Sequence, residues 1–182
     1  MLDLPARLDE IFRELSRGRH LSAQDGDLYS TLEQRPDDYI LIFSKLGFEL
    51  VHDARGFYYF AGSNRGIAGG VQRLALFVYI FIDWLADSGE SITEALAGKA
   101  FAVDALPHLS SERYRGYLAH VDVENADGLS DIIRNMDNFG FAKQMGDGSF
   151  RFLPPVHRIV DACIASKPDT TTIDVIHEPE LC

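Results

Sequence analysis

A repeated segment is the feature that most constrains how this chain can fold. Residues 46–60 read LGFELVHDARGFYYF and residues 139–152 read FGFAKQMGDGSFRF, which gives Gly47 and Gly140 equivalent places. Self-similarity of this kind predicts that one small structural unit occurs twice in the chain. Two unrelated helix–hairpin units, a common arrangement, are the alternative interpretation.

Each copy begins at the end of an apolar stripe that is typical of a helix. Tyr39, Phe43 and Leu46 are spaced at i, i+4 and i+7, which puts them on one helical face. The second copy repeats that spacing with Ile132, Met136 and Phe139. We expect both helices to stop at the glycine that follows, because glycine tolerates the left-handed conformation of a helix C-cap.

A pattern typical of a two-stranded wing follows each glycine. The first copy has a turn at 53–56 (DARG) before the run FYYF, and the second has a turn at 146–148 (GDG) before SFRF. Both turns are rich in residues that accept positive φ or turn readily. A helix, a glycine stop and a wing, found twice, predict an α+β protein that is mainly α with small β wings, organised as tandem winged-helix domains.

The rest of the sequence divides around these two units. The chain has 182 residues, 46% of them hydrophobic, which suits one or two small packed domains. Apolar periodicity predicts further helices over 6–17, 25–35, 70–87, 91–98, 110–121 and 155–166. We expect an N-terminal winged-helix unit at 1–69, a connecting buried helix at 70–90, a C-terminal winged-helix unit at 91–166 and an acidic mobile tail at 167–182.

The charge balance disfavours a protein that binds DNA by itself. The formal net charge is -11, so the field of the whole chain repels a phosphate backbone. In a winged-helix protein that binds a specific DNA sequence, the helix before the wing contacts the bases. In the first unit, Lys45 is the only side chain of this helix suited to such a contact. The second offers Arg134, Asn135 and Asn138, but both helices also carry two acids. These helices are poorly suited to reading bases, so a winged-helix transcription regulator is only the alternative function.

Motifs for catalysis, cofactors or metals are not found in the sequence. The six histidines do not form HExxH, the two cysteines do not form CxxC, and the glycine-rich loop 61–70 lacks the end of a P-loop. We expect no enzyme activity, no cofactor and no metal. The apolar run at 74–82 is shorter than the roughly 20 residues of a membrane span. The N-terminus lacks a secretory pattern, and both cysteines are expected to be free thiols, which indicates the cytoplasm.

Two sets of residues are candidate contacts. The first wing and the following helix carry apolar rings on more than one face, which predicts burial against another protein chain, with a thicker internal core as the alternative. This aromatic set is Phe57, Tyr58, Tyr59, Phe77, Phe81 and Trp84. The basic set can contact phosphate or an acidic peptide, with solvated surface as the alternative. Its members are Arg55, Arg65, Arg73, Arg134, Lys143, Arg151 and Arg158.

Four stretches together resemble the MukE/MksE family of accessory subunits in bacterial MukBEF- and MksBEF-type condensins. They are SRGRHLSAQDGDLY at 16–29, GFELVHDARGFYYF at 47–60, LPHLSSERYRGYL at 106–118 and FGFAKQMGDGSFRFLPPV at 139–156. The resemblance covers about residues 8–165. It is closest to the shorter MksE members.

This resemblance implies a non-catalytic subunit with a kleisin-interacting tandem winged-helix fold. Such proteins form homodimers, bind a kleisin of the MksF or MukF type, and regulate an SMC ATPase of the MksB or MukB type in chromosome condensation and partition. They act in the cytoplasm, at the nucleoid, and Mks relatives coupled to a nuclease take part in plasmid defence. MukE has an arginine-rich helix where this chain has Asp137, Asn138 and Phe139. DNA contact is therefore expected to be indirect or weak.

Overall fold

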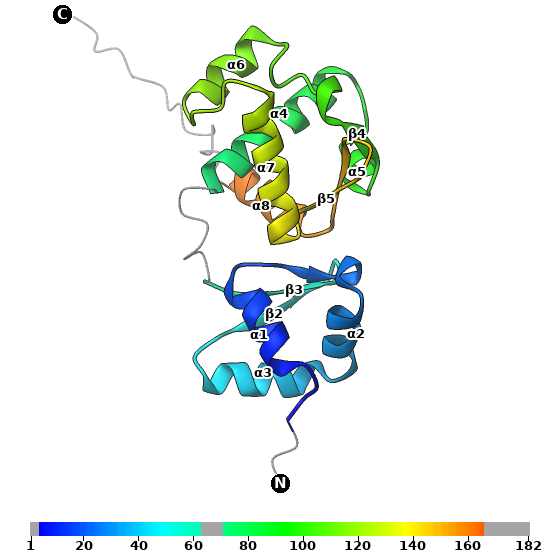
Figure 1. Ribbon diagram of the computed structural model, residues 1–182, viewed down its shortest axis with the longest axis vertical. Coiled ribbons are helices and arrows are strands. Elements are labelled where there is room, and N and C mark those ends of the chain that lie inside the picture. The colour runs from blue at the N-terminus through cyan, green and yellow to red at the C-terminus, as the bar shows by residue number, and fades with distance from the viewer. Residues whose placement is uncertain (1–3, 63–70, 166–182) are drawn as a thin grey trace, which may run out of the picture.

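The computed structural model describes residues 4–62 and 71–165 of the chain. Figure 1 shows two units of helices and sheet stacked along the long axis, with the N-terminal unit at one end and the C-terminal unit at the other. Each unit holds a three-stranded antiparallel sheet. The predicted α+β class, mainly helical with small β wings in two winged-helix units, is confirmed.

The N-terminal unit follows the order helix, strand, two helices and hairpin. Its sheet has the order β1-β3-β2, with Leu21 opposite Tyr58 and Leu50 opposite Phe60. Its elements are α1 (Leu8–Ser16), β1 (Leu21–Ser22), the 3₁₀ turn η1 (Ala23–Asp25), α2 (Asp27–Gln34), α3 (Pro36–Lys45), β2 (Leu50–Asp53) and β3 (Phe57–Phe60).

Apolar stripes on the helices close the core of this unit. Ile11 and Leu15 are both buried on α1, because residues four apart share one face of a helix. Helix α3 begins at Pro36, whose fixed φ suits the first helical turn. It buries Tyr39 and Phe43, as the predicted stripe requires.

The C-terminal unit repeats that order of elements and adds a helix at each end. Its sheet has the order β4-β6-β5, with Phe101 opposite Phe150 and Ala142 opposite Phe152. Its elements are α4 (Val71–Asp87), α5 (Ile92–Leu96), β4 (Ala100–Ala102), the 3₁₀ turn η3 (Val103–Ala105), α6 (Glu112–Ala119), α7 (Ala126–Phe139), β5 (Ala142–Gln144), β6 (Ser149–Phe152) and α8 (Val156–Ala165).

The two glycines that anchor the repeat have the same conformation. Gly47 has φ 83° and Gly140 has φ 79°, so both hold the left-handed conformation that was predicted for the end of a helix. In each unit a hairpin follows, and its last strand also pairs with a short strand from earlier in the unit. The sequence pattern did not predict these short strands, β1 and β4, because two or three residues carry too little alternation.

Helix α4 packs as part of the C-terminal core. Leu74, Phe77 and Phe81 are buried there together with side chains from the sheet and from the other helices of that unit. The helix was predicted over 70–87 and is found at Val71–Asp87. The division of the chain at 69, 90 and 166 stays a prediction, and the expected tail at 167–182 lies outside the described residues.

Candidate interaction surfaces

Four of the six aromatic candidates are fully buried. Phe57, Tyr58, Phe77 and Phe81 are each 0% exposed. Tyr58, Phe77 and Phe81 belong to the two hydrophobic cores, which favours the interpretation that these rings thicken the core. Phe57 lies outside both cores, beside His20 at the junction of the units, with the ring centres 6.1 Å apart. We assign none of these four rings a partner contact. Tyr59 and Trp84 are half-buried, and a partner contact for these two stays a prediction.

The basic candidates are mostly paired with nearby acids. Arg55 contacts Asp161 at 2.8 Å, and Arg134 contacts Asp131 at 2.8 Å. Lys143 and Arg73 lie 3.5 and 3.8 Å from the carboxylates of Asp137 and Asp122 respectively. Arg65 lies outside the described residues. Exposed pairs of this kind contribute little stability, about 0–1 kcal/mol, but they reduce the positive charge that a phosphate backbone would meet.

The second recognition helix ends against the N-terminal unit. In Figure 1, α7 runs toward the first sheet. Nη1 of Arg19 donates to the backbone oxygens of Asp137 at 3.2 Å and Asn138 at 3.0 Å. Those carbonyls belong to the last turn of α7, where oxygens lack the regular hydrogen bond of the helix interior; the oxygen of Asp137 also accepts from the N–H of Gly140 at 3.0 Å. Asp25 holds the guanidinium of Arg19 in place at 2.6 Å, so this arginine joins the two units while it caps a helix.

His20 makes a second set of contacts across the same junction. Its backbone N–H donates to the oxygen of Phe139 at 2.9 Å, and its Nδ1 lies 3.1 Å from that oxygen. The carbonyl can only accept, so Nδ1 carries the proton and Nε2 has a free lone pair. Nη1 of Arg158 lies 2.5 Å from Nε2 and donates to it. The guanidinium carbon of Arg158 also lies 3.7 Å from the centre of the Tyr59 ring, a cation–π contact between the units.

Burial decides the charge of His20. The side chain is almost fully enclosed, and burial, reinforced by the nearby charge of Arg158, lowers the pKa of His20 to about 3. The ring is therefore neutral at physiological pH, which is the form that can accept a hydrogen bond from Arg158. In the sequence, His20 stands out only within the stretch 16–29 that carries the family resemblance, because nothing local marks a histidine whose partners Phe139 and Arg158 lie far along the chain.

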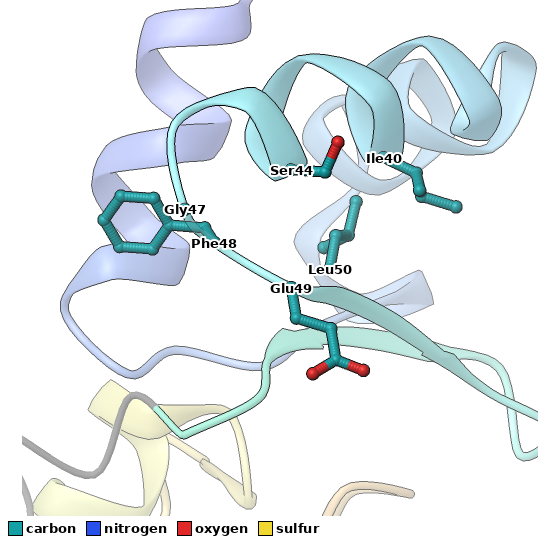
Figure 2. Close-up of a pocket in the computed structure, with 6 residues that line it drawn as sticks. All are labelled: Ile40, Ser44, Gly47, Phe48, Glu49 and Leu50. Carbon is teal, nitrogen blue, oxygen red and sulfur yellow. The ribbon is translucent and has the colours of Figure 1, made fainter.

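Helix α3 presents apolar side chains to solvent. Leu41 is 59% exposed, Leu46 is 61% exposed and Ile40 is 37% exposed. Leu46 was predicted to share a helical face with Tyr39 and Phe43, but α3 ends at Lys45 and Leu46 is the capping residue beyond it. A shallow pocket of about 260 Å³ lies beside this face. In Figure 2 the Phe48 ring points toward α1, away from Ile40. A helix that reads DNA would place polar and basic side chains on this face.

A groove with mostly apolar lining lies between α4 and α8. It has a volume of about 420 Å³. The side chains that line it are Tyr79, Ile82, Asp83, Ala86, Ile92, Val160, Cys163 and Ile164. Ile164 is 62% exposed and Tyr79 is 39% exposed. Cys163 is a free thiol whose pKa is raised by burial.

Residues 4–62 and 71–165 hold no group of three or more His, Cys, Asp or Glu side chains that could bind a metal ion. Over the same ranges, no helix combines the length and the apolar character that crossing a membrane requires. The protein is therefore a tandem winged-helix protein. Its two units contact each other at an internal junction, and it exposes apolar faces to solvent.

Comparison with known proteins narrows that class to one family. A family model described as condensin complex protein MksE matches residues 6–164. The chain therefore belongs to the MksE family, and the resemblance seen in the sequence is confirmed. Membership makes the chain a subunit of a condensin complex. No curated protein matches the chain.

Proposed function

We propose that this chain is the non-catalytic subunit of a bacterial SMC complex that forms a homodimer, binds the kleisin and regulates the SMC ATPase. It would act in the cytoplasm, at the nucleoid, in chromosome organisation and partition. Membership of the MksE family supports the proposal. The observation that carries it is the outward apolar surface at two places, on α3 and between α4 and α8, because exposed apolar patches mark sites of protein association.

We assign the α3 face to the homodimer. Figure 1 places α3 at the end of the N-terminal unit that is farthest from the C-terminal unit, so the face is open to a second copy. Two exposed leucines, Leu41 and Leu46, would bury each other across a two-fold axis, where the same patch meets itself. The acids Asp37 and Asp38 at the start of the helix would lie at the polar rim of such an interface.

We assign the groove between α4 and α8 to an apolar segment of the kleisin. The length of α4 and its lack of charge between Leu74 and Ile82 supply apolar side chains on both its inner and its outer face. The inner face fills the core, and Tyr79 and Ile82 remain for a partner. An amphipathic segment laid in a hydrophobic groove is a recurrent mode of peptide recognition. Trp84, half-buried on the same helix, does not line this groove. Its predicted partner contact would lie outside the groove.

Size-exclusion chromatography with light scattering tests the proposal. The purified chain should elute as a dimer, and it should co-elute with the kleisin from the same organism. Leu41→Glu should yield monomers that still bind the kleisin, and Ile164→Glu should yield dimers that do not. Asn135→Asp adds one negative charge at an exposed position on α7 and should change neither property. Absence of co-elution with the wild-type chain would refute the assigned role.

The alternative of a DNA-binding regulator has less support from the structure. The exposed face of α3 is apolar and acidic, and the end of α7 is covered by Arg19 and His20. A gel shift with the chain alone should show at most weak, sequence-independent binding. Nanomolar binding that depends on the DNA sequence would favour the regulator instead. Plasmid retention, measured beside chromosome partition in a deletion strain, tests whether the complex also serves plasmid defence.

A further inference from the structure

A second concave surface lies at the junction of the two units. It has a volume of about 340 Å³, enough for one or two side chains of a bound peptide. Gln24 and Arg55 from the N-terminal unit line it together with Arg151 and His157 from the C-terminal unit. The remaining lining residues are Leu96, Ala97, Gly98, Phe152, Leu153 and Pro154. The pocket exists only because the two units are docked together.

The two arginines that line this pocket can bind an anion. Nη2 of Arg151 donates to the amide oxygen of Gln24 at 2.6 Å, and the described part of the chain gives Arg151 no carboxylate partner. A guanidinium has five N–H donors, so most of them stay free after a single hydrogen bond to a neutral amide. Arg55, which also lines the pocket, pairs with the exposed carboxylate of Asp161, which an incoming carboxylate can replace.

The pocket is also apolar at its base. Leu96, Phe152 and Leu153 line it and are each less than a tenth exposed. A ligand that fits both the basic walls and the apolar base carries a carboxylate next to a hydrophobic group. Guanidinium groups suit carboxylates because their planar forks can donate two parallel hydrogen bonds.

We propose that this junction pocket binds an acidic peptide segment of a partner protein, with a Glu or Asp side chain between Arg55 and Arg151 and an apolar neighbour on the base. The partner role rests on the proposed function above. A segment bound here would contact both units at once and would therefore favour the docked arrangement over any separated one, since a ligand stabilises the state that it binds.

Nucleic acid fits the same pocket less well. DNA-binding surfaces present several cations along a track of phosphates, whereas this pocket is a small concavity with an apolar base. The formal net charge of the chain is -11, and Asp161 stands at the rim beside Arg55. The summed field therefore opposes a polyanion, while a single carboxylate needs only the two local arginines.

Fluorescence anisotropy with a labelled peptide tests the proposal on the full-length chain. The probe is a short fluorescein-labelled peptide that alternates glutamate with leucine and glycine, and its counterpart has glutamine in place of every glutamate. Arg55→Gln and Arg151→Gln should each weaken binding of the glutamate peptide roughly tenfold, as expected for a charge-assisted hydrogen bond. Arg134→Gln, which makes the same charge change away from the pocket, should leave it unchanged.

Asp161→Asn is expected to increase peptide affinity, a result that misfolding of the variant would not produce. Removal of the competing carboxylate frees Arg55 and should tighten binding of the glutamate peptide roughly threefold. Circular dichroism spectra should match those of the wild type for all four variants. Three results would overturn the proposal. The first is equal binding of the two peptides, and the second is unchanged peptide binding by the Arg55 and Arg151 variants. The third is that these variants lose binding to a short DNA duplex and not to the peptide. Co-elution of the kleisin with the wild-type chain is a separate measurement. It tests the proposed function independently of the peptide-binding result.

Discussion

Nε2 of His20 lies 2.5 Å from Nη1 of Arg158, in a junction where the histidine has to be neutral to accept that hydrogen bond. The same histidine donates its backbone N–H to the carbonyl of Phe139, at the end of the helix that precedes the second wing. A residue between α1 and β1 thus holds an arginine on α8 and the C-terminus of α7. These contacts join the two winged-helix units, together with those of Arg19, Arg55 and Arg151.

The close approach of the backbone at Gly140 gives a first prediction. A Cβ atom added there would lie 2.4 Å from the oxygen of His20, whereas one added at Gly47 would meet nothing within 4 Å. Both glycines have positive φ, so both Gly→Ala variants pay the conformational cost of roughly 1 kcal/mol. Gly140→Ala should lose about 2–4 kcal/mol of unfolding free energy in urea, because backbone must also move. Equal losses for the two variants would show that the junction is not tightly packed.

The two buried histidines predict loss of stability in acid. Burial lowers the pKa of His20 to about 3 and that of His108 to about 4, from an ordinary value of 6.5. Between those limits the unfolded chain binds protons that the folded chain does not, so the unfolding free energy falls as the pH falls below 6.5. Each histidine contributes a slope of up to about 1.4 kcal/mol per pH unit.

Urea unfolding at a series of pH values from 7.5 to about 4.5 measures this slope. His108→Gln removes one of the two titrating groups and should make the slope shallower, even though the loss of the ring contact with Phe77 lowers the stability at every pH. The same slope in the variant and the wild type would mean that His108 titrates normally in the folded chain.

The aromatic residues of α4 should separate into core and surface positions. Phe81 is 0% exposed and meets Phe101, Phe152 and Trp84 edge to face. Phe81→Ala should cost about 3–5 kcal/mol of unfolding free energy, through lost burial and the cavity left behind. Trp84→Ala should cost less, since its ring is half-buried, and should weaken kleisin binding in the co-elution assay. A Trp84→Ala variant with full kleisin binding would remove that residue from the partner surface.

Much of each unit could be predicted because its signals are local. The stripe through Tyr39 and Phe43, the glycine that ends each of the two helices and the turn at 53–56 all lie within a few residues of one another. In that turn the N–H of Gly56 donates to the oxygen of Asp53 at 2.9 Å. Helical periodicity and turn chemistry act over such distances, so the order of elements follows from the chain alone.

The candidate site was less predictable, because exposure depends on the whole fold. Phe77 and Leu41 are both apolar residues on helices, yet Phe77 fills a core and Leu41 is open to solvent. Likewise Arg158 was a candidate phosphate contact, but in the fold it stacks on Tyr59 from the other unit. The sequence identifies such residues as candidate contacts, but it does not determine whether each side chain points into the core or to the surface.

By itself, the sequence determined the repeated unit, its helices and wings, and the negative charge that opposes free DNA binding, since each depends on residue type and short spacing. Only the tertiary structure decided how the two units meet. Arg19 and His20 find their partners more than a hundred residues away, at Asp137, Asn138 and Phe139. Polar contacts of that range depend on the tertiary structure, because the carbonyls at the end of α7 are brought together as a binding site only when the helix has formed.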